Sequence, residues 1–197
     1  MNRIYMEISA FDELYSLIDE YSSRYLSDTE SDYMPILLAE VKKRIRQLRR
    51  LLTIIIQLSD RFHTLQPQIT ALPPFEGPDP PALVVEWIEV NDSIEMYTEA
   101  FYYIAWRLRQ VIRQLPKFRS FDPRGVRFVR NHMIEHPERH GKDVLWAFSL
   151  NRDLGPVLLR ASGADEQLLD KGLWQNATEF IDMFKKKLER AITIQRE

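Results

Sequence analysis

The sequence predicts an all-α protein, an up-and-down bundle of about five helices with two long antiparallel central helices and a small β-hairpin inserted before the last helix. Apolar residues recur at alternating four- and three-residue spacings over residues 32–66 and 82–115, as in long helices that pack along one face. A proline-rich stretch, 67–81, separates these two runs, and a turn-rich pentapeptide, 151–155, separates two short apolar runs further on. The 197 residues are enough for one domain with a substantial core, so we expect a single domain over 1–197.

The first helix is expected to begin near Ser9, whose hydroxyl can cap it, while Asp12 complements the helix dipole. The acidic segment 27–32 is expected to be the turn that follows. The predicted buried face of this helix consists of Phe11, Leu14, Ile18, Tyr21 and Tyr25.

The two central helices are expected at about residues 32–66, with Pro35 in the first turn, and at about residues 82–115. The predicted seam of the first contains Met34, Leu38, Val41, Ile45, Leu48, Leu52, Ile55 and Phe62. The predicted seam of the second contains Trp87, Val90, Ile94, Tyr97, Phe101, Ile104, Leu108, Val111 and Leu115. Because a single loop joins them, we expect these helices to pack antiparallel.

A fourth helix is expected after Asp122, an N-cap residue followed by proline at the first helical position, and Pro137 should end it near Glu135 or His136. Residues 143–160 are then expected to form the hairpin. Residues 162–165 resemble a further cap and predict that the last helix begins there. Its predicted buried face contains Leu173 or Trp174, Ala177, Ile181, Phe184, Leu188 and Ile192.

The composition excludes several classes of function. Without cysteine, the chain can hold no disulfide scaffold, iron–sulfur site or cysteine nucleophile. No apolar run approaches the roughly 20 residues of a membrane span, and the start lacks the long apolar run of a signal peptide, so we expect a cytoplasmic protein with no membrane partner. The chain has no glycine-rich phosphate loop and no G-x-S-x-G motif, and we expect no cofactor.

The charges are unevenly distributed, although the net charge of −2 provides no overall attraction to nucleic acid. If the central helices turn back near residue 75, position i lies beside about 150 − i. Basic residues then gather at one end: Lys42, Lys43, Arg44, Arg46, Arg49, Arg50, Arg107, Arg109, Arg113, Lys117, Arg119, Arg124, Arg127 and Arg130. Acidic residues gather at the other: Glu86, Glu89, Asp92, Glu95 and Glu99.

A basic end of this kind can hold a phosphate backbone. Its candidate nucleic-acid-binding residues are Arg107, Arg109, Arg124 and Arg127. The alternative is that these charges are solvated helix faces, partnered by nearby acids such as Glu40.

Three of the four histidines fall within nine residues, in the fourth helix and the loop after it. At 100° per residue, Val126, Val129 and Met133 share one stripe of that helix, and Arg130 and His136 straddle it. A guanidinium beside an apolar face is expected to be either paired or functional. The end of the helix favours the protonated form of His136.

Arg130-Asn131, followed after four residues by His136, resembles the motif of the HEPN superfamily. HEPN domains are helical bundles of about this size, and their motif lies on a late helix. Many of them cleave RNA without metal at a cleft between two subunits. Others only bind nucleic acids or nucleotides. The resemblance implies that His136 moves the proton of the attacking 2′-hydroxyl, that Arg130 stabilises charge on the phosphorane, and that Asn131 orients one of its oxygens.

The resemblance also implies RNA as a partner and a homodimer formed through the face that carries the fourth helix, and it leaves room for a regulatory protein partner. The chain departs from the pattern at Glu138, where members paired with a nucleotidyltransferase often have tyrosine. Arg127 and His132 fit the spacing of the motif as well.

Two other interpretations remain open. His132-Met133-Ile134-Glu135-His136 matches the H-x-x-E-H pattern of a zinc peptidase family, with His140 or Glu138 as a third ligand, but Pro137 ends the helix where His136 would have to be held.

Alternatively, the protein is a non-catalytic helical scaffold or dimerisation protein in which His136 caps the helix and Arg130 is salt-bridged. The third helix would then use its aromatic residues in the core: Trp87, Tyr97, Tyr102, Tyr103 and Trp106.

Overall fold

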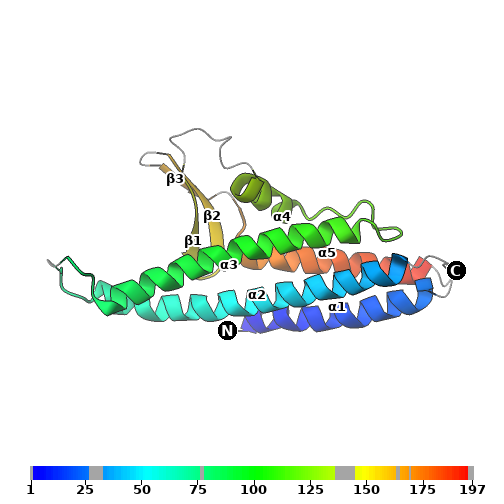
Figure 1. Ribbon diagram of the computed structural model, residues 1–197, viewed down its shortest axis with the longest axis horizontal. Helices are drawn as coiled ribbons and strands as arrows, with labels where there is room; N and C mark the ends of the chain where they lie inside the picture. Colours follow the sequence, from blue (N-terminus) through cyan, green and yellow to red (C-terminus); the bar gives the residue numbers. More distant parts are fainter. Residues whose placement is uncertain are drawn as a thin grey trace.

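The computed structural model describes residues 2–26, 33–75, 78–135, 145–162, 165–168 and 170–194. The helices are α1 (Asn2–Leu26), α2 (Tyr33–Thr70), α3 (Ala82–Ile112), α4 (Arg124–Val129), the π-helical segment η1 (Arg130–Glu135) and α5 (Leu173–Ile194). The strands are β1 (Leu145–Asn151), β2 (Gly155–Ser162) and β3 (Asp165–Leu168). This arrangement confirms the predicted helical bundle with a small antiparallel hairpin before the last helix (Figure 1).

The two long helices α2 and α3 form the antiparallel pair that the sequence predicts. At one end the Arg61 side chain bonds the Glu86 carboxylate, with 2.8 Å between Nε and Oε1. At the other end the Tyr33 hydroxyl lies 3.0 Å from Oε1 of Gln114. Both contacts lie within a few residues of the predicted register. The acidic and basic ends of the pair are therefore separated in space, as predicted.

The helices α1 and α5 run alongside this pair and complete the bundle (Figure 1). Every residue predicted for the buried faces of α1, α2 and α5 is buried, because the helical repeat of 3.6 residues brings these apolar positions onto one side. The α2–α3 pair extends beyond the other helices in Figure 1. A second, smaller core stabilises this end, with Phe62, Leu65, Val90 and Ile94 at its centre.

The hairpin forms where the turn residues predict it. Residues Leu145–Asn151 and Gly155–Ser162 pair in antiparallel register. In the turn between them, the Asn151 side-chain oxygen accepts the backbone N–H groups of Asp153 at 2.9 Å and Leu154 at 3.1 Å. Gly155 follows with φ of +71°, a conformation that favours glycine, and a Cβ there would lie 2.4 Å from the Trp174 ring. The predicted hairpin is therefore confirmed.

Several helix boundaries differ from the prediction. The last helix begins at Leu173 instead of near 162, because residues 165–168 form β3, which covers the free edge of β2. The Trp174 backbone N–H bonds the Leu154 carbonyl at 3.2 Å, which places the start of α5 against the hairpin turn. The first helix begins at Asn2 instead of near Ser9, and α2 continues past Pro67 to Thr70.

The buried face of α3 is broader than predicted. Trp87, Tyr97, Ile104 and Val111 are only half-buried, whereas the buried set of this helix also contains Thr98, Tyr102, Ala105, Arg109 and Ile112. The cause is that the second half of α3 contacts α2 on one side and α4, η1 and β2 on another. A single stripe of apolar residues therefore does not predict all the buried residues of a helix that packs on two sides.

A buried polar network joins α3, the sheet and α5. The Asp170 carboxylate accepts the Leu158 backbone N–H at 2.9 Å and the Asn176 amide at 2.8 Å. The same amide lies 2.9 Å from the Tyr102 hydroxyl. A Cβ on Gly125 would lie 2.1 Å from the Asn176 side-chain oxygen, so glycine lets the start of α4 approach this network closely.

The stability of the protein should depend on pH through Asp170. Burial raises the pKa of this carboxyl, and hydrogen bonds from the Leu158 and Gly172 backbone and from Asn176 oppose the rise. The folded protein therefore keeps the proton to higher pH than the unfolded chain, and the free energy of unfolding should decrease as the pH rises above the ordinary value of 3.8. Urea unfolding of the wild type and of Asp170→Asn over this range should show the decrease in the wild type and a flatter curve in the variant. Parallel curves would contradict the role of Asp170.

Candidate nucleic-acid interface

The short helix α4 lies over the second half of α3 (Figure 1). Val126 and Val129 anchor it in the core, and Phe118 and Phe121 anchor the loop before it. The predicted N-cap at Asp122 is wrong, because Pro123 occupies the cap position and no side-chain hydrogen bond caps the helix. The Asp122 carboxylate is used in ion pairs instead, which connect this loop to both helices.

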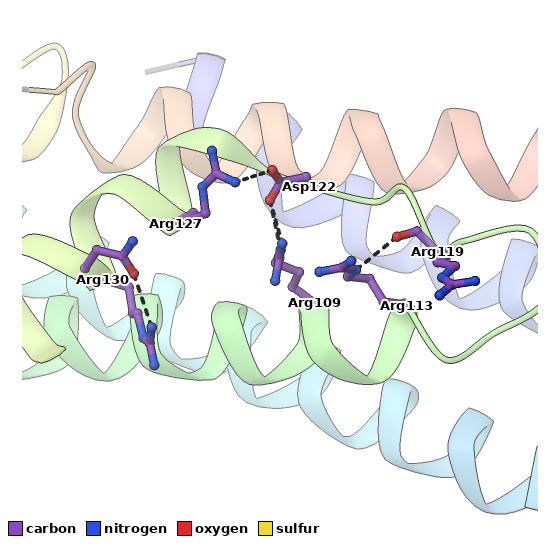
Figure 2. Close-up of polar contacts among 7 residues, drawn as sticks. Arg109, Arg113, Arg119, Asp122, Arg127 and Arg130 are labelled. Carbon is purple, nitrogen blue, oxygen red and sulfur yellow. Dashed lines mark hydrogen bonds and ion pairs between the residues drawn. The ribbon is translucent and has the colours of Figure 1, made fainter.

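Asp122 is shared by two arginines from different helices (Figure 2). Nε of Arg109 lies 2.9 Å from one carboxylate oxygen, and Nη1 of Arg127 lies 2.7 Å from the other. Arg109 is buried, and burial lowers its pKa while the Asp122 charge opposes that change. Because one carboxylate faces two guanidinium groups, the cluster keeps a net positive charge.

Two arginines lie over the ring of Trp106. The guanidinium carbon of Arg109 is 4.3 Å from the centroid of the indole ring, and that of Arg130 is 4.5 Å away. Such contacts are cation–π interactions, which orient a guanidinium and leave its edge N–H groups for other partners. Trp106 is half-buried: it packs against the core, as the scaffold interpretation expects, and its ring is also in contact with these two arginines.

Arg130 and Asn131, the first two residues of the candidate catalytic motif, contact each other. Nη1 of Arg130 donates to the Asn131 side-chain oxygen at 3.1 Å (Figure 2). Burial lowers the pKa of Arg130, Tyr103 opposes the shift, and Arg109 adds to it. The third residue, His136, lies outside the described residues, and so do Glu138 and His140.

The motif begins where the helix changes its winding. Residues Arg130–Glu135 are π-helical, with hydrogen bonds to the fifth residue back, and such turns occur frequently at functional sites. The predicted side of the helix for His136 depends on 100° per residue, and this value does not hold from Arg130 onward. Within this segment Nδ1 of His132 donates to the Phe128 carbonyl at 2.7 Å, and the two rings lie 4.2 Å apart.

The four candidate binding arginines do not all converge. Arg109 and Arg127 meet at Asp122, and Arg124 lies one turn before Arg127 on the exposed side of α4. Arg107 is two residues from Arg109, which at 3.6 residues per turn places it on the opposite side of α3. It is exposed there, away from the cluster.

Two members of the cluster are not among the predicted site residues. From the sequence, Asp122 is expected to be a helix cap and Trp106 a core residue. The signal that could have found them is the excess of charge around them: residues 100–130 contain eight arginines and lysines and a single acid, Asp122. Arg113 belongs to the same group, and its Nε donates to the Arg119 carbonyl at 3.0 Å (Figure 2).

The basic residues of α2 are arranged differently from those of α3 and α4. Four of them form ion pairs with acids of α1 or of α2 itself: Lys42 with Asp19, Lys43 and Arg44 with Glu40, and Arg49 with Asp12. The interpretation of charges as partnered helix faces therefore holds for these four residues. A second group of basic residues forms the α3–α4 basic surface, which we define as the exposed Arg113, Arg119, Arg124 and Arg127, the half-buried Arg130 and the buried Arg109.

The described residues contain no group of three or more side chains suited to hold a metal ion. Of the residues in the zinc interpretation, only the side chain of His132 is described. None of the described helices combines the length and the apolar character that a membrane span requires.

Comparisons with protein-family models, with curated proteins and with solved structures find no match to this chain. The likeness to the HEPN superfamily therefore rests on the Arg130-Asn131…His136 motif and on the helical architecture.

Proposed function

We propose that this protein binds RNA through the α3–α4 basic surface and cleaves it without metal at a HEPN-like centre formed by Arg130, Asn131 and His136. The observation that carries the proposal is the placement of Arg130 on the Trp106 ring, beside the Arg109–Asp122–Arg127 cluster. This brings the motif arginine to a part of the chain, residues 100–130, that contains eight arginines and lysines and one acid.

The chemistry of the surface suits a single-stranded RNA backbone. Arginine donates two parallel hydrogen bonds to a phosphate, and several arginines along a surface can follow successive phosphates. Phe128 is partly exposed beside His132 at the edge of this surface and offers a ring on which an unpaired base can stack.

The proposed reaction uses the residues in distinct roles. His136 removes the proton from the 2′-hydroxyl, the resulting oxygen bonds to phosphorus, and the bond from phosphorus to the 5′-oxygen breaks. The products are a 2′,3′-cyclic phosphate and a 5′-hydroxyl, whose proton comes from water. Arg130 stabilises the charge that develops on the other phosphate oxygens. Because Asn131 already accepts a hydrogen bond from Arg130, we assign it the role of positioning that guanidinium.

The same proposal includes a homodimer, a cytoplasmic location and regulation by a protein partner. The alternative function is a non-catalytic scaffold. If the scaffold interpretation is right, the protein binds no RNA, or it binds RNA equally well after a surface arginine is removed. RNA binding by a variant that lacks one surface arginine therefore distinguishes the proposed function from the scaffold.

Arg127→Ala should weaken binding to an unstructured polyuridine RNA and reduce the dependence of the affinity on salt. Losing one phosphate contact should lower the slope of log K against log salt concentration by about 0.7 for a single strand. The measurement is fluorescence anisotropy over a series of salt concentrations. Arg46→Ala is the matched control, since Arg46 is exposed on α2 outside the surface. No RNA binding by the wild type, or equal losses in both variants, would contradict the proposal.

A further inference from the structure

The outward side of α3 carries a stripe of exposed side chains. Six of them, which we call the α3 stripe, are Asp92, Met96, Glu99, Tyr103, Arg107 and Gln110. They recur at intervals of three and four residues, so they share one side of the helix. This side faces away from α2, and at Tyr103 it borders η1, since Tyr103 lies close enough to Arg130 to influence the pKa of that guanidinium.

The stripe has an apolar centre that is unusual for a solvent-facing surface. Met96 is 55% exposed and Tyr103 is 46% exposed. Val85 and Ile88 are also exposed earlier on α3, so this helix holds four of the eight large exposed apolar residues in the described part of the chain. Exposed apolar side chains bordered by charges are typical of a surface that another protein covers.

The charges of the stripe are arranged symmetrically about Tyr103. Glu99 lies four residues before it and Arg107 four residues after it. Met96 and Gln110 lie seven residues before and after. Acids occur only on one side of Tyr103 within the stripe, and the cationic residue only on the other. The stripe is therefore complementary to a second stripe that runs in the opposite direction.

We propose that a second copy of this chain binds the α3 stripe, antiparallel to it, about a two-fold axis at Tyr103. Each Glu99 then faces Arg107 of the second copy, and this ion pair occurs twice. The two tyrosines meet at the axis, and each Met96 packs on the aliphatic part of Gln110. A two-fold contact requires a self-complementary patch of this kind, and a parallel arrangement would place acid against acid.

Two further observations agree with this contact. Burial and the nearby charge of Glu95 raise the pKa of Glu99, and a guanidinium opposite Glu99 would relieve that repulsion. Arg107 lies on the opposite side of α3 from Arg109, so the proposed ion pairs lie away from the Arg109–Asp122–Arg127 cluster, whereas Tyr103 at the axis lies near Arg130. The inference rests on the homodimer that is part of the proposed function, and it does not depend on RNA binding. The proposed interface lies on α3, whereas the resemblance to the HEPN superfamily implies an interface on the face that carries α4.

The test is a charge swap followed by sedimentation velocity over a range of protein concentrations. The wild type should be dimeric, and Glu99→Arg and Arg107→Glu should each raise the dimer dissociation constant at least about tenfold, because each puts like charges opposite one another. The double variant should be dimeric again. An equimolar mixture of the two single variants should form heterodimers, since each then supplies the charge that the other lacks. Arg46→Glu, on α2 outside both the stripe and the α3–α4 basic surface, is the control and should remain dimeric.

Three results would overturn the inference: a wild type that stays monomeric at all concentrations, a dimer that both reversals leave unchanged, or a mixture that does not associate. The substituted positions are exposed, and circular dichroism with an unfolding midpoint verifies the fold of each variant. Polyuridine binding is measured on the same samples. A failed charge swap with RNA binding retained overturns only the interface, whereas a successful swap without RNA binding overturns only the RNA part of the proposed function.

Discussion

Cleavage of RNA by the purified protein in EDTA should fall about 10²- to 10⁴-fold in His136→Ala, because general acid–base catalysis contributes a factor of this size. Arg130→Ala should reduce the rate about 10²- to 10³-fold, as removal of a group that stabilises the developing charge does in other enzymes. The measurement is the initial rate on a labelled RNA at fixed salt. Asn131→Ala should have a smaller effect, since Asn131 positions Arg130 through a single hydrogen bond.

The matched control for this prediction is His132→Ala. Arg127 and His132 also satisfy the spacing of the motif, but Nδ1 of His132 is bonded to the Phe128 carbonyl and Arg127 is paired with Asp122. Cleavage should therefore persist in His132→Ala. Activity that appears only with added zinc and that disappears in both histidine variants would contradict the metal-independent site. Equal rates in the wild type and in His136→Ala would exclude His136 as the base.

Asp122→Ala should lower the free energy of unfolding by about 2–3 kcal/mol, since removing one partner of an ion pair leaves a buried charge uncompensated. The side chain of Arg109 is only 7% exposed and has little access to water, whereas that of Asp122 is 31% exposed. The partial exposure of Asp122 keeps the effect below that of a fully buried pair. Urea unfolding at neutral pH measures the change.

Two further variants separate the buried pair from the exposed one. Arg127→Ala removes the partner whose side chain is 46% exposed, and it should cost less than about 1 kcal/mol. Arg109→Met combined with Asp122→Ala removes both charges and should be more stable than Asp122→Ala alone, because no buried charge remains. If Asp122→Ala and Arg127→Ala are equally stable, the buried ion pair does not support the loop between α3 and α4.

The parts of the fold that could be predicted are those that depend on local spacing. The buried residues of α1, α2 and α5 follow from the helical repeat because each of these helices buries a single face. The prediction failed for the second half of α3, which packs on two sides, and for residues 165–168, which pair with β2 although their local sequence resembles a helix start. A partner that is distant in sequence determined the structure in both places.

The candidate site shows the same division. The sequence alone determined the helical bundle, the antiparallel central pair with its acidic and basic ends, and the neighbouring positions of Arg130 and Asn131, since all of these depend on periodicity and order along the chain. Only the tertiary structure decided that Asp122 joins Arg109 to Arg127, that Trp106 holds Arg130, and that Arg107 faces away from them. The physical reason is that these contacts depend on how α4 lies over α3, and that placement depends on long-range packing at Val126, Val129 and Phe121.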